Sequence, residues 1–179
     1  MKRKQSWCLA VLLFLPLPCH CQNTGQQTQG LTAQLNAYAE LSVPGAATLT
    51  HIGATFQPFT GTVSINYRAR TTAASGSASL TLKATSDFSP AGGPSVSAGH
   101  LSYTCTSASL GTPCSGTQTV STTAQTPVVT IGAGACTGGG GACSSTDPNT
   151  AQLSFTLFNL ISFKTGIYSA TLTFTVSAL

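Results

Sequence analysis

The sequence predicts an all-β protein, an antiparallel β-sandwich of about eight strands with little helix. The first observation is the end of the chain, where the even positions of residues 168–178 are apolar and the odd positions are Ser or Thr. Because successive side chains of a strand point to opposite faces, this segment has one dry face and one hydroxyl face. The second is that Gly and Pro turn signals separate further short apolar runs, and no segment keeps a helical period with caps. A barrel or a jelly roll is the alternative architecture.

Residues 1–21 are predicted to be a secretory signal peptide. Residues 2–4 are basic, residues 7–17 are apolar, and Cys19 and Cys21 supply small side chains before the expected cleavage site. The apolar run is too short to span a bilayer. Lipid attachment to Cys19 or Cys21 is the alternative. We therefore expect a secreted, periplasmic or cell-surface protein without a membrane span.

Few charges remain beyond the predicted leader. The whole chain has a formal net charge of +4, but three of its seven basic residues lie in residues 2–4. The remaining four bases and three acids leave a net charge of +1. The basic character of the chain therefore gives no reason to expect a nucleic-acid partner. The 158 residues from 22 to 179 are enough for one domain with its own core.

Four cysteines follow the leader, namely Cys105, Cys114, Cys136 and Cys143. An even number in a secreted chain predicts two disulfides, for which three pairings are possible. We favour Cys105–Cys114 and Cys136–Cys143 because each pair closes a short turn-rich stretch. A zinc site is the alternative, but the spacings are not of the short Cys-x2-Cys type. We expect no metal and no cofactor.

The first segments after the leader are a polar lead-in and a long strand. Residues 22–30 are Gln-rich and predicted to be flexible, and residues 31–179 are predicted to form a single sandwich domain. Residues 31–43 alternate between apolar and polar side chains, which predicts a strand of about 43 Å at about 3.3 Å per residue. Since this exceeds a usual strand, either it bends between sheets or part of it projects from the domain.

Shorter strands and turns follow along the chain. Val63, Ile65 and Tyr67 are predicted to point inward, as are Leu80 and Leu82. Turn residues predict loops at 90–94 and 132–150 and a tight turn at 164–166. The predicted strands are 46–52, 61–68, 77–84, 100–106, 118–122, 127–131, 152–163 and 168–178, with 118–122 and 127–131 expected to pair.

The sequence contains no motif of an enzyme, and we expect no catalytic activity. It lacks the Gly-x-Ser-x-Gly turn that presents a nucleophilic serine. A catalytic site assembled from distant residues is the alternative, because triads need no proximity in sequence. Such a site would bring together at least two members of one set. The set is Glu40, His51, Asp87, His100 and Asp147.

Two features suit a ligand such as a glycan. Tyr38 is the one aromatic residue on a polar strand face, and Thr171, Thr173 and Thr175 form a row of hydroxyls. Each has a simpler interpretation, Tyr38 as a cross-strand partner and the threonines as the wet face of a sheet with few charges.

The closing residues 166–176 read Gly-Ile-Tyr-Ser-Ala-Thr-Leu-Thr-Phe-Thr-Val. This segment resembles the terminal Gly-x-Tyr strand of bacterial pilin-like domains, among them chaperone–usher pilins and spore coat U-like secreted proteins. The resemblance implies an incomplete immunoglobulin-like sandwich in a bacterial envelope, completed by an extended segment of a neighbour. The donor positions would be Leu31, Ala33, Leu35, Ala37 and Ala39. An ordinary first strand within its own domain is the alternative.

Together these features predict a secreted structural or adhesive surface protein, a pilus- or coat-like subunit that assembles by β-strand addition. Its expected partner is a second copy or another surface protein. The alternative is a secreted ligand- or glycan-binding module without catalytic activity.

Overall fold

The computed structural model describes residues 30–34, 38–51, 53, 55–70, 76–132 and 148–178. The chain divides into two compact units, Met1–Gln34 and Leu35–Leu179. In the first unit, residues 30–34 form no strand and Leu31 is 93% exposed. The predicted signal peptide and most of the predicted lead-in lie outside the described residues.

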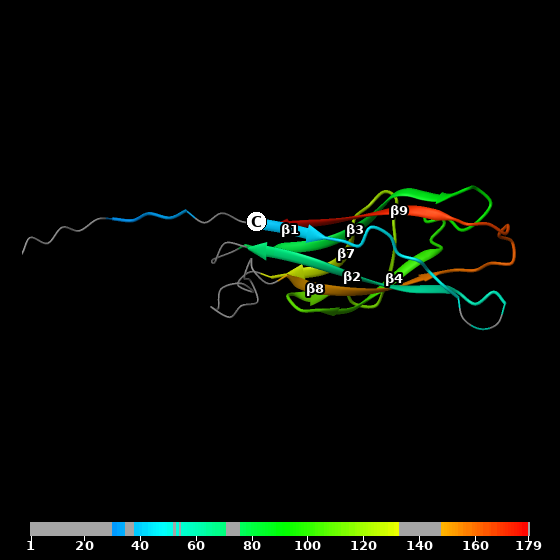
Figure 1. Cartoon of the computed structure of the whole chain (residues 1–179), viewed down its shortest axis with the longest axis horizontal. Coiled ribbons are helices and arrows are strands. Elements are labelled where there is room, and N and C mark those ends of the chain that lie inside the picture. The colour runs from blue at the N-terminus through cyan, green and yellow to red at the C-terminus, as the bar shows by residue number, and fades with distance from the viewer. Residues whose placement is uncertain are drawn as a thin grey trace, which may run out of the picture. The chain divides into compact units, whose positions relative to one another are not determined.

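The second unit is an antiparallel β-sandwich, as predicted, and its described residues form no helix. One sheet has five strands in the order β1-β2-β8-β4-β6, and the other has four in the order β5-β7-β3-β9. In Figure 1 the longer strands of both sheets run lengthwise along this unit. The strands are β1 (Tyr38–Ser42), β2 (Phe59–Arg70), β3 (Ala78–Ser89), β4 (Leu101–Ala108), β5 (Thr112–Pro113), β6 (Thr117–Thr119), β7 (Thr126–Ile131), β8 (Asn149–Leu157) and β9 (Ser169–Ala178).

The core lies between the two sheets and consists of the inward faces of their alternating strands. Val63, Ile65 and Tyr67 of β2 are buried, as are Leu80 and Leu82 of β3, which confirms the predicted inward positions. Strands β4, β7 and β8 add further buried side chains to the same cluster. Burying each large aliphatic side chain contributes about 1.5–3 kcal/mol relative to leaving it exposed.

The first predicted strand is much shorter in the structure. The alternation of residues 31–43 predicts thirteen residues, whereas β1 has five. β1 pairs with β2 from Ser42 opposite Asn66 to Tyr38 opposite Arg70, where β2 ends. Residues 30–34 form no strand, and residues 35–37 and 71–75 lie outside the described residues.

Two further strand predictions are wrong. The described residues 46–51 contribute only an isolated antiparallel bridge between Thr50 and Thr60, and Leu49 packs closely against Gly61. The predicted pair 118–122 and 127–131 does not form, since β6 pairs with β4 and β7 pairs with β3 and β5. The chain crosses from one sheet to the other between β6 and β7, so two neighbouring runs of strand sequence lie in different layers.

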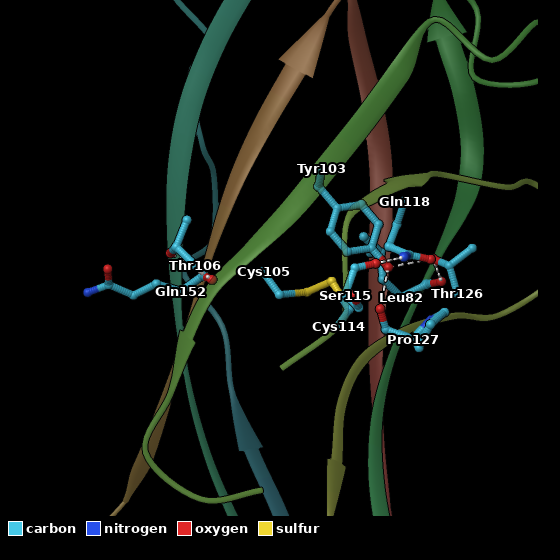
Figure 2. Close-up of a disulfide and its surroundings, with 10 residues drawn as sticks. All are labelled: Leu82, Tyr103, Cys105, Thr106, Cys114, Ser115, Gln118, Thr126, Pro127 and Gln152. Carbon is cyan, nitrogen blue, oxygen red and sulfur yellow. Dashed lines mark hydrogen bonds between the residues drawn. A yellow bond between two sulfur atoms is a disulfide. The ribbon is translucent and has the colours of Figure 1, made fainter. Parts of the chain in front are cut away.

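The two sheets are joined by a disulfide and by buried tyrosines. Cys105 of β4 is bonded to Cys114, directly after β5, so the predicted pairing is confirmed and the bond joins the two sheets. Beside it, the Tyr103 hydroxyl bonds with Thr126 Oγ1 at 2.9 Å and donates to the Pro127 carbonyl at 2.7 Å (Figure 2). The other predicted disulfide, Cys136–Cys143, lies outside the described residues.

A second tyrosine makes a similar connection. The hydroxyl of Tyr67 on β2 donates to the backbone carbonyl of Leu110 in the connection between β4 and β5. Burial raises the pKa of both Tyr67 and Tyr103, because removal from water disfavours the phenolate. Their hydrogen bonds oppose that effect without cancelling it.

Candidate functional site

The candidate site is the edge of the four-stranded sheet that is formed by β9. Among the described strands β9 pairs with β3 alone, from Ala78 opposite Ala178 to Ser89 opposite Ser169. Its other side therefore presents a row of backbone N–H and C=O groups that no described strand pairs with. Such an edge is a ready template for pairing with another chain.

The apolar face of β9 is only half covered. Its inward side chains pack against the core but stay partly exposed, whereas Leu80 and Leu82 on the adjacent β3 have no exposed surface. The sequence predicts that this face is fully buried. In the structure it is only partly buried and partly exposed to solvent. The cause is the facing sheet, whose edge strand β1 has five residues against ten in β9 and contributes only Leu41 to the partly buried shell.

The other face of β9 carries the predicted hydroxyl row. These side chains bond to the matching row on β3, so part of their hydrogen-bonding capacity is used within the sheet. The bonds join Ser79 to Ser177 at 3.0 Å, Thr85 to Thr173 at 3.2 Å, and Thr81 to the Thr175 carbonyl at 3.3 Å.

The facing edge strand β1 has a polar outer face. Glu40 Oε2 accepts hydrogen bonds from Arg68 and from the Tyr38 hydroxyl, each at 2.7 Å. The bond from Arg68, followed by that from Tyr38, holds the pKa of Glu40 below its ordinary value. The same bond to Glu40, with some desolvation, raises the pKa of Tyr38. The half-exposed ring of Tyr38, the candidate glycan contact, is thus tied to an ion pair through its hydroxyl.

A shallow hollow of about 210 Å³ lies next to this ion pair. Its walls come from β1, from β2 and from the residue before β8. They are lined by Glu40, Ser42, Asn66, Tyr67, Arg68 and Pro148.

The predicted donor positions fall into three groups. Leu31 and Ala33 are exposed within the first unit. Leu35 and Ala37 lie outside the described residues. Ala39 belongs to β1 and pairs with Ala69 of its own chain, so this position belongs to the domain's own first strand.

Two of the five residues considered for a hidden catalytic site do meet. Both Asp87 and His100 bind Ser95, whose hydroxyl donates to Asp87 at 2.7 Å and whose backbone N–H donates to Nδ1 of His100 at 3.0 Å. In a catalytic triad the serine hydroxyl instead donates to the imidazole. This geometry makes the group a clamp for the loop between β3 and β4.

The other three residues of that set lie apart from the clamp or outside the description. His51 stacks on Phe59 with ring centroids 5.2 Å apart, and Glu40 binds Arg68. Asp147 lies outside the described residues.

The carboxylate of Asp87 is the centre of the clamp, which sequence reasoning missed. Partial burial alone would raise its pKa, but hydrogen bonds from Ser95, Val96, Ser97 and Phe88 outweigh burial and hold the pKa far below its ordinary value. The one available signal was an acid close to a Ser-x-Ser pair, which is too common to indicate a contact.

No protein-family model matches the chain, and no curated protein or solved structure is significantly similar to it. Within the described ranges no helix has the length and apolarity needed to cross a membrane. The fold therefore defines the class of this protein as an all-β sandwich in which β9 is an edge strand.

Proposed function

We propose that this protein is a secreted structural or adhesive subunit of a bacterial envelope that assembles by β-strand addition at β9. The observation that carries the proposal is the combination of a free backbone edge with a half-covered apolar face along the same strand. An added strand would gain main-chain hydrogen bonds from the edge, and its alternate side chains would cover the exposed apolar surface.

The donor in this proposal is the alternating segment around residues 31–37 of a second copy. Its sequence repeats apolar side chains at every other position, which is what an added strand needs in order to face a core. Among the described residues of its own chain, the pairing with β2 covers Tyr38–Ser42, and residues 30–34 form no strand. The resemblance of residues 166–176 to the final strand of pilin-like domains agrees with β9 as the acceptor.

The experiment uses the chain from residue 22 onward and two variants with equal charge changes. In the first, Leu31→Asp and Leu35→Asp place charges on the apolar face of the donor. In the matched control, Thr32→Asp and Asn36→Asp place them on the opposite face. Size-exclusion chromatography with light scattering should give concentration-dependent oligomers for the wild type and the control, and monomers for the first variant.

Hydrogen–deuterium exchange would then locate the contact. Amides of β9 that point away from β3 should gain protection in the oligomer, because they receive new backbone partners. A wild type that is monomeric at every concentration, or equal behaviour of the two double variants, would contradict strand addition.

The second candidate function is binding of a glycan, favoured by the half-exposed Tyr38 beside the hollow. The hollow offers an amide from Asn66 and charged groups from Glu40 and Arg68, which suit hydroxyl-rich ligands. A glycan array should give hits that Tyr38→Ala removes and that the donor-segment variants retain. An array without hits would leave strand addition as the sole proposal. No catalytic role is assigned to the Ser95 clamp.

A further inference from the structure

Two loops at one end of the 35–179 unit expose large apolar side chains together. We name this surface the apolar tip and define it as Phe56, Phe158, Leu160, Ile161 and Ile167, all of which are exposed. Ile161 is 80% exposed and Ile167 is 93% exposed. Figure 1 shows the loop before β2 in cyan and the loop between β8 and β9 in orange at the same end. Single exposed apolar residues are ordinary, but a group of them on one surface indicates an interaction site.

A hydrogen bond joins the two loops, and others anchor the longer loop to the sandwich. Asn159 Nδ2 donates to the Gln57 carbonyl at 3.2 Å, which connects the loops. The backbone N–H of Phe158 donates to the His100 carbonyl at 3.0 Å, and that of Lys164 donates to the Gly92 carbonyl at 2.9 Å. The polar backbone of the longer loop therefore bonds inward, while its aliphatic side chains remain outside.

Tyr168 adds a further anchor at the end of this loop. Its hydroxyl donates to the carbonyl of Lys164 at 2.7 Å. Its ring also fills the space beside Gly93, where an added Cβ would overlap Cε1 of the ring. The apolar tip is thus held in its exposed arrangement by the fold.

The two loops of the tip carry positive charge and no negative charge. Residues 53–58 and 158–168 contain no acid, and Lys164 is their one charged residue and is exposed. Asp87, near the end of β3, has its carboxylate occupied by the clamp. A surface with exposed aliphatic groups next to a lysine complements an anionic lipid layer, where acyl chains accept the apolar groups and phosphates accept the ammonium.

We propose that the apolar tip docks on a lipid surface, with Ile161 and Ile167 entering its outer layer and Lys164 contacting phosphate groups. A second copy fits less well, because a two-fold contact between tips would bring two Lys164 side chains together without an acid from either loop. The hollow lined by β1 and β2 residues belongs to a different part of the sandwich. This inference goes beyond strand addition and does not depend on it.

The test measures sedimentation of the chain from residue 22 onward with two kinds of vesicle. One is pure phosphatidylcholine, and the other is phosphatidylcholine mixed with phosphatidylglycerol. The wild type should bind both and prefer the anionic mixture. Ile161→Ser with Ile167→Ser should weaken binding to both vesicles by about tenfold or more, because two aliphatic side chains that would enter the lipid are lost. Lys164→Gln should keep binding to phosphatidylcholine and lose the preference for the mixture.

The control is Val43→Ser, which removes an exposed aliphatic side chain directly after β1 that does not belong to the tip. It should bind vesicles as the wild type does, and thermal unfolding should show that all variants are folded. The proposal is overturned if the wild type binds neither vesicle, or if the tip variant and the control bind equally. A tip variant that changes the oligomeric state while its vesicle binding stays at the wild-type level would also overturn it, in favour of a second copy.

Discussion

The carboxylate of Asp87 holds the loop between β3 and β4 by accepting hydrogen bonds from residues on both sides of a reverse turn. Phe88 N–H donates to it at 2.7 Å from the near side, and the Ser95 and Ser97 hydroxyls donate at 2.7 and 2.8 Å from the far side. A carboxylate with several donors is strongly favoured in its charged form. These hydrogen bonds, together with the burial of Val96 in the core, order the loop.

We predict that Asp87→Asn lowers the free energy of unfolding by about 2 kcal/mol at neutral pH, because the amide accepts fewer of these bonds. The folded-state pKa of Asp87 is depressed, so this stabilisation is complete above its ordinary value of 3.8 and is lost as the pH falls further. Urea unfolding of wild type and variant should therefore converge in acid. Glu40→Gln serves as the control, since its exposed ion pair contributes little.

The contact of Gly93 with Tyr168 gives a second prediction at this scale. Gly93→Ala should destabilise the protein by about 1–3 kcal/mol, because a Cβ would overlap the tyrosine ring and displace it. Gly45→Ala is the matched control, because no atom lies within 4 Å of its added Cβ. Equal unfolding free energies for the two alanine variants would contradict the tight contact.

At the scale of elements, alternation predicts which residues form strands but not which strands they join. Strands β2 and β3 follow their predicted apolar positions because the side chains at these positions face the core between the sheets. The described part of β1 is five residues long, and the pair expected at 118–131 separates into two sheets. Register and partner depend on contacts between distant residues, which a single sequence does not contain.

The candidate sites illustrate the same limit. The alternation of β9 was visible, but its half-covered face depends on the length of β1 in the other sheet. The apolar tip was hidden because residues 152–163 form one apolar run, which predicts a buried strand throughout. The structure ends β8 at Leu157, and the rest of the run becomes exposed loop.

The disulfide gives a prediction at the scale of elements. Replacing both Cys105 and Cys114 by Ser should lower the free energy of unfolding by about 2–3 kcal/mol. The reason is that the unfolded chain is no longer restricted by a closed loop of this length. Urea unfolding of the variant and of the oxidised wild type measures this difference. A variant as stable as the oxidised wild type would show that the bond between the sheets adds no stability.

At the scale of the whole molecule, the two sheets share a small set of buried polar connections. Tyr67 and Tyr103 both belong to the five-stranded sheet and bond outside it, Tyr103 to β7 of the four-stranded sheet. Burial disfavours the ionised phenolate form of both tyrosines. Raising the pH into the alkaline range should therefore weaken these connections.

We predict that the protein loses stability as the pH rises above about 10. Folding raises the pKa of both tyrosines above the ordinary value of 10.0, so their contribution is complete below that value and declines as the pH rises through the folded values. Tyr103→Phe should cost about 1 kcal/mol at neutral pH and flatten this decline. Thermal unfolding followed from neutral to alkaline pH measures both effects, and an unchanged alkaline decline in the variant would contradict the assignment.

The paired hydroxyl rows of β3 and β9 also determine how this protein responds to salt. A surface that is hydrated through hydroxyls has almost no ion pairs for sodium chloride to screen. Sulfate acts differently, because it is excluded from protein surfaces and strengthens the burial of apolar area. Association between copies through β9 should therefore be indifferent to changes in sodium chloride and should increase with sulfate.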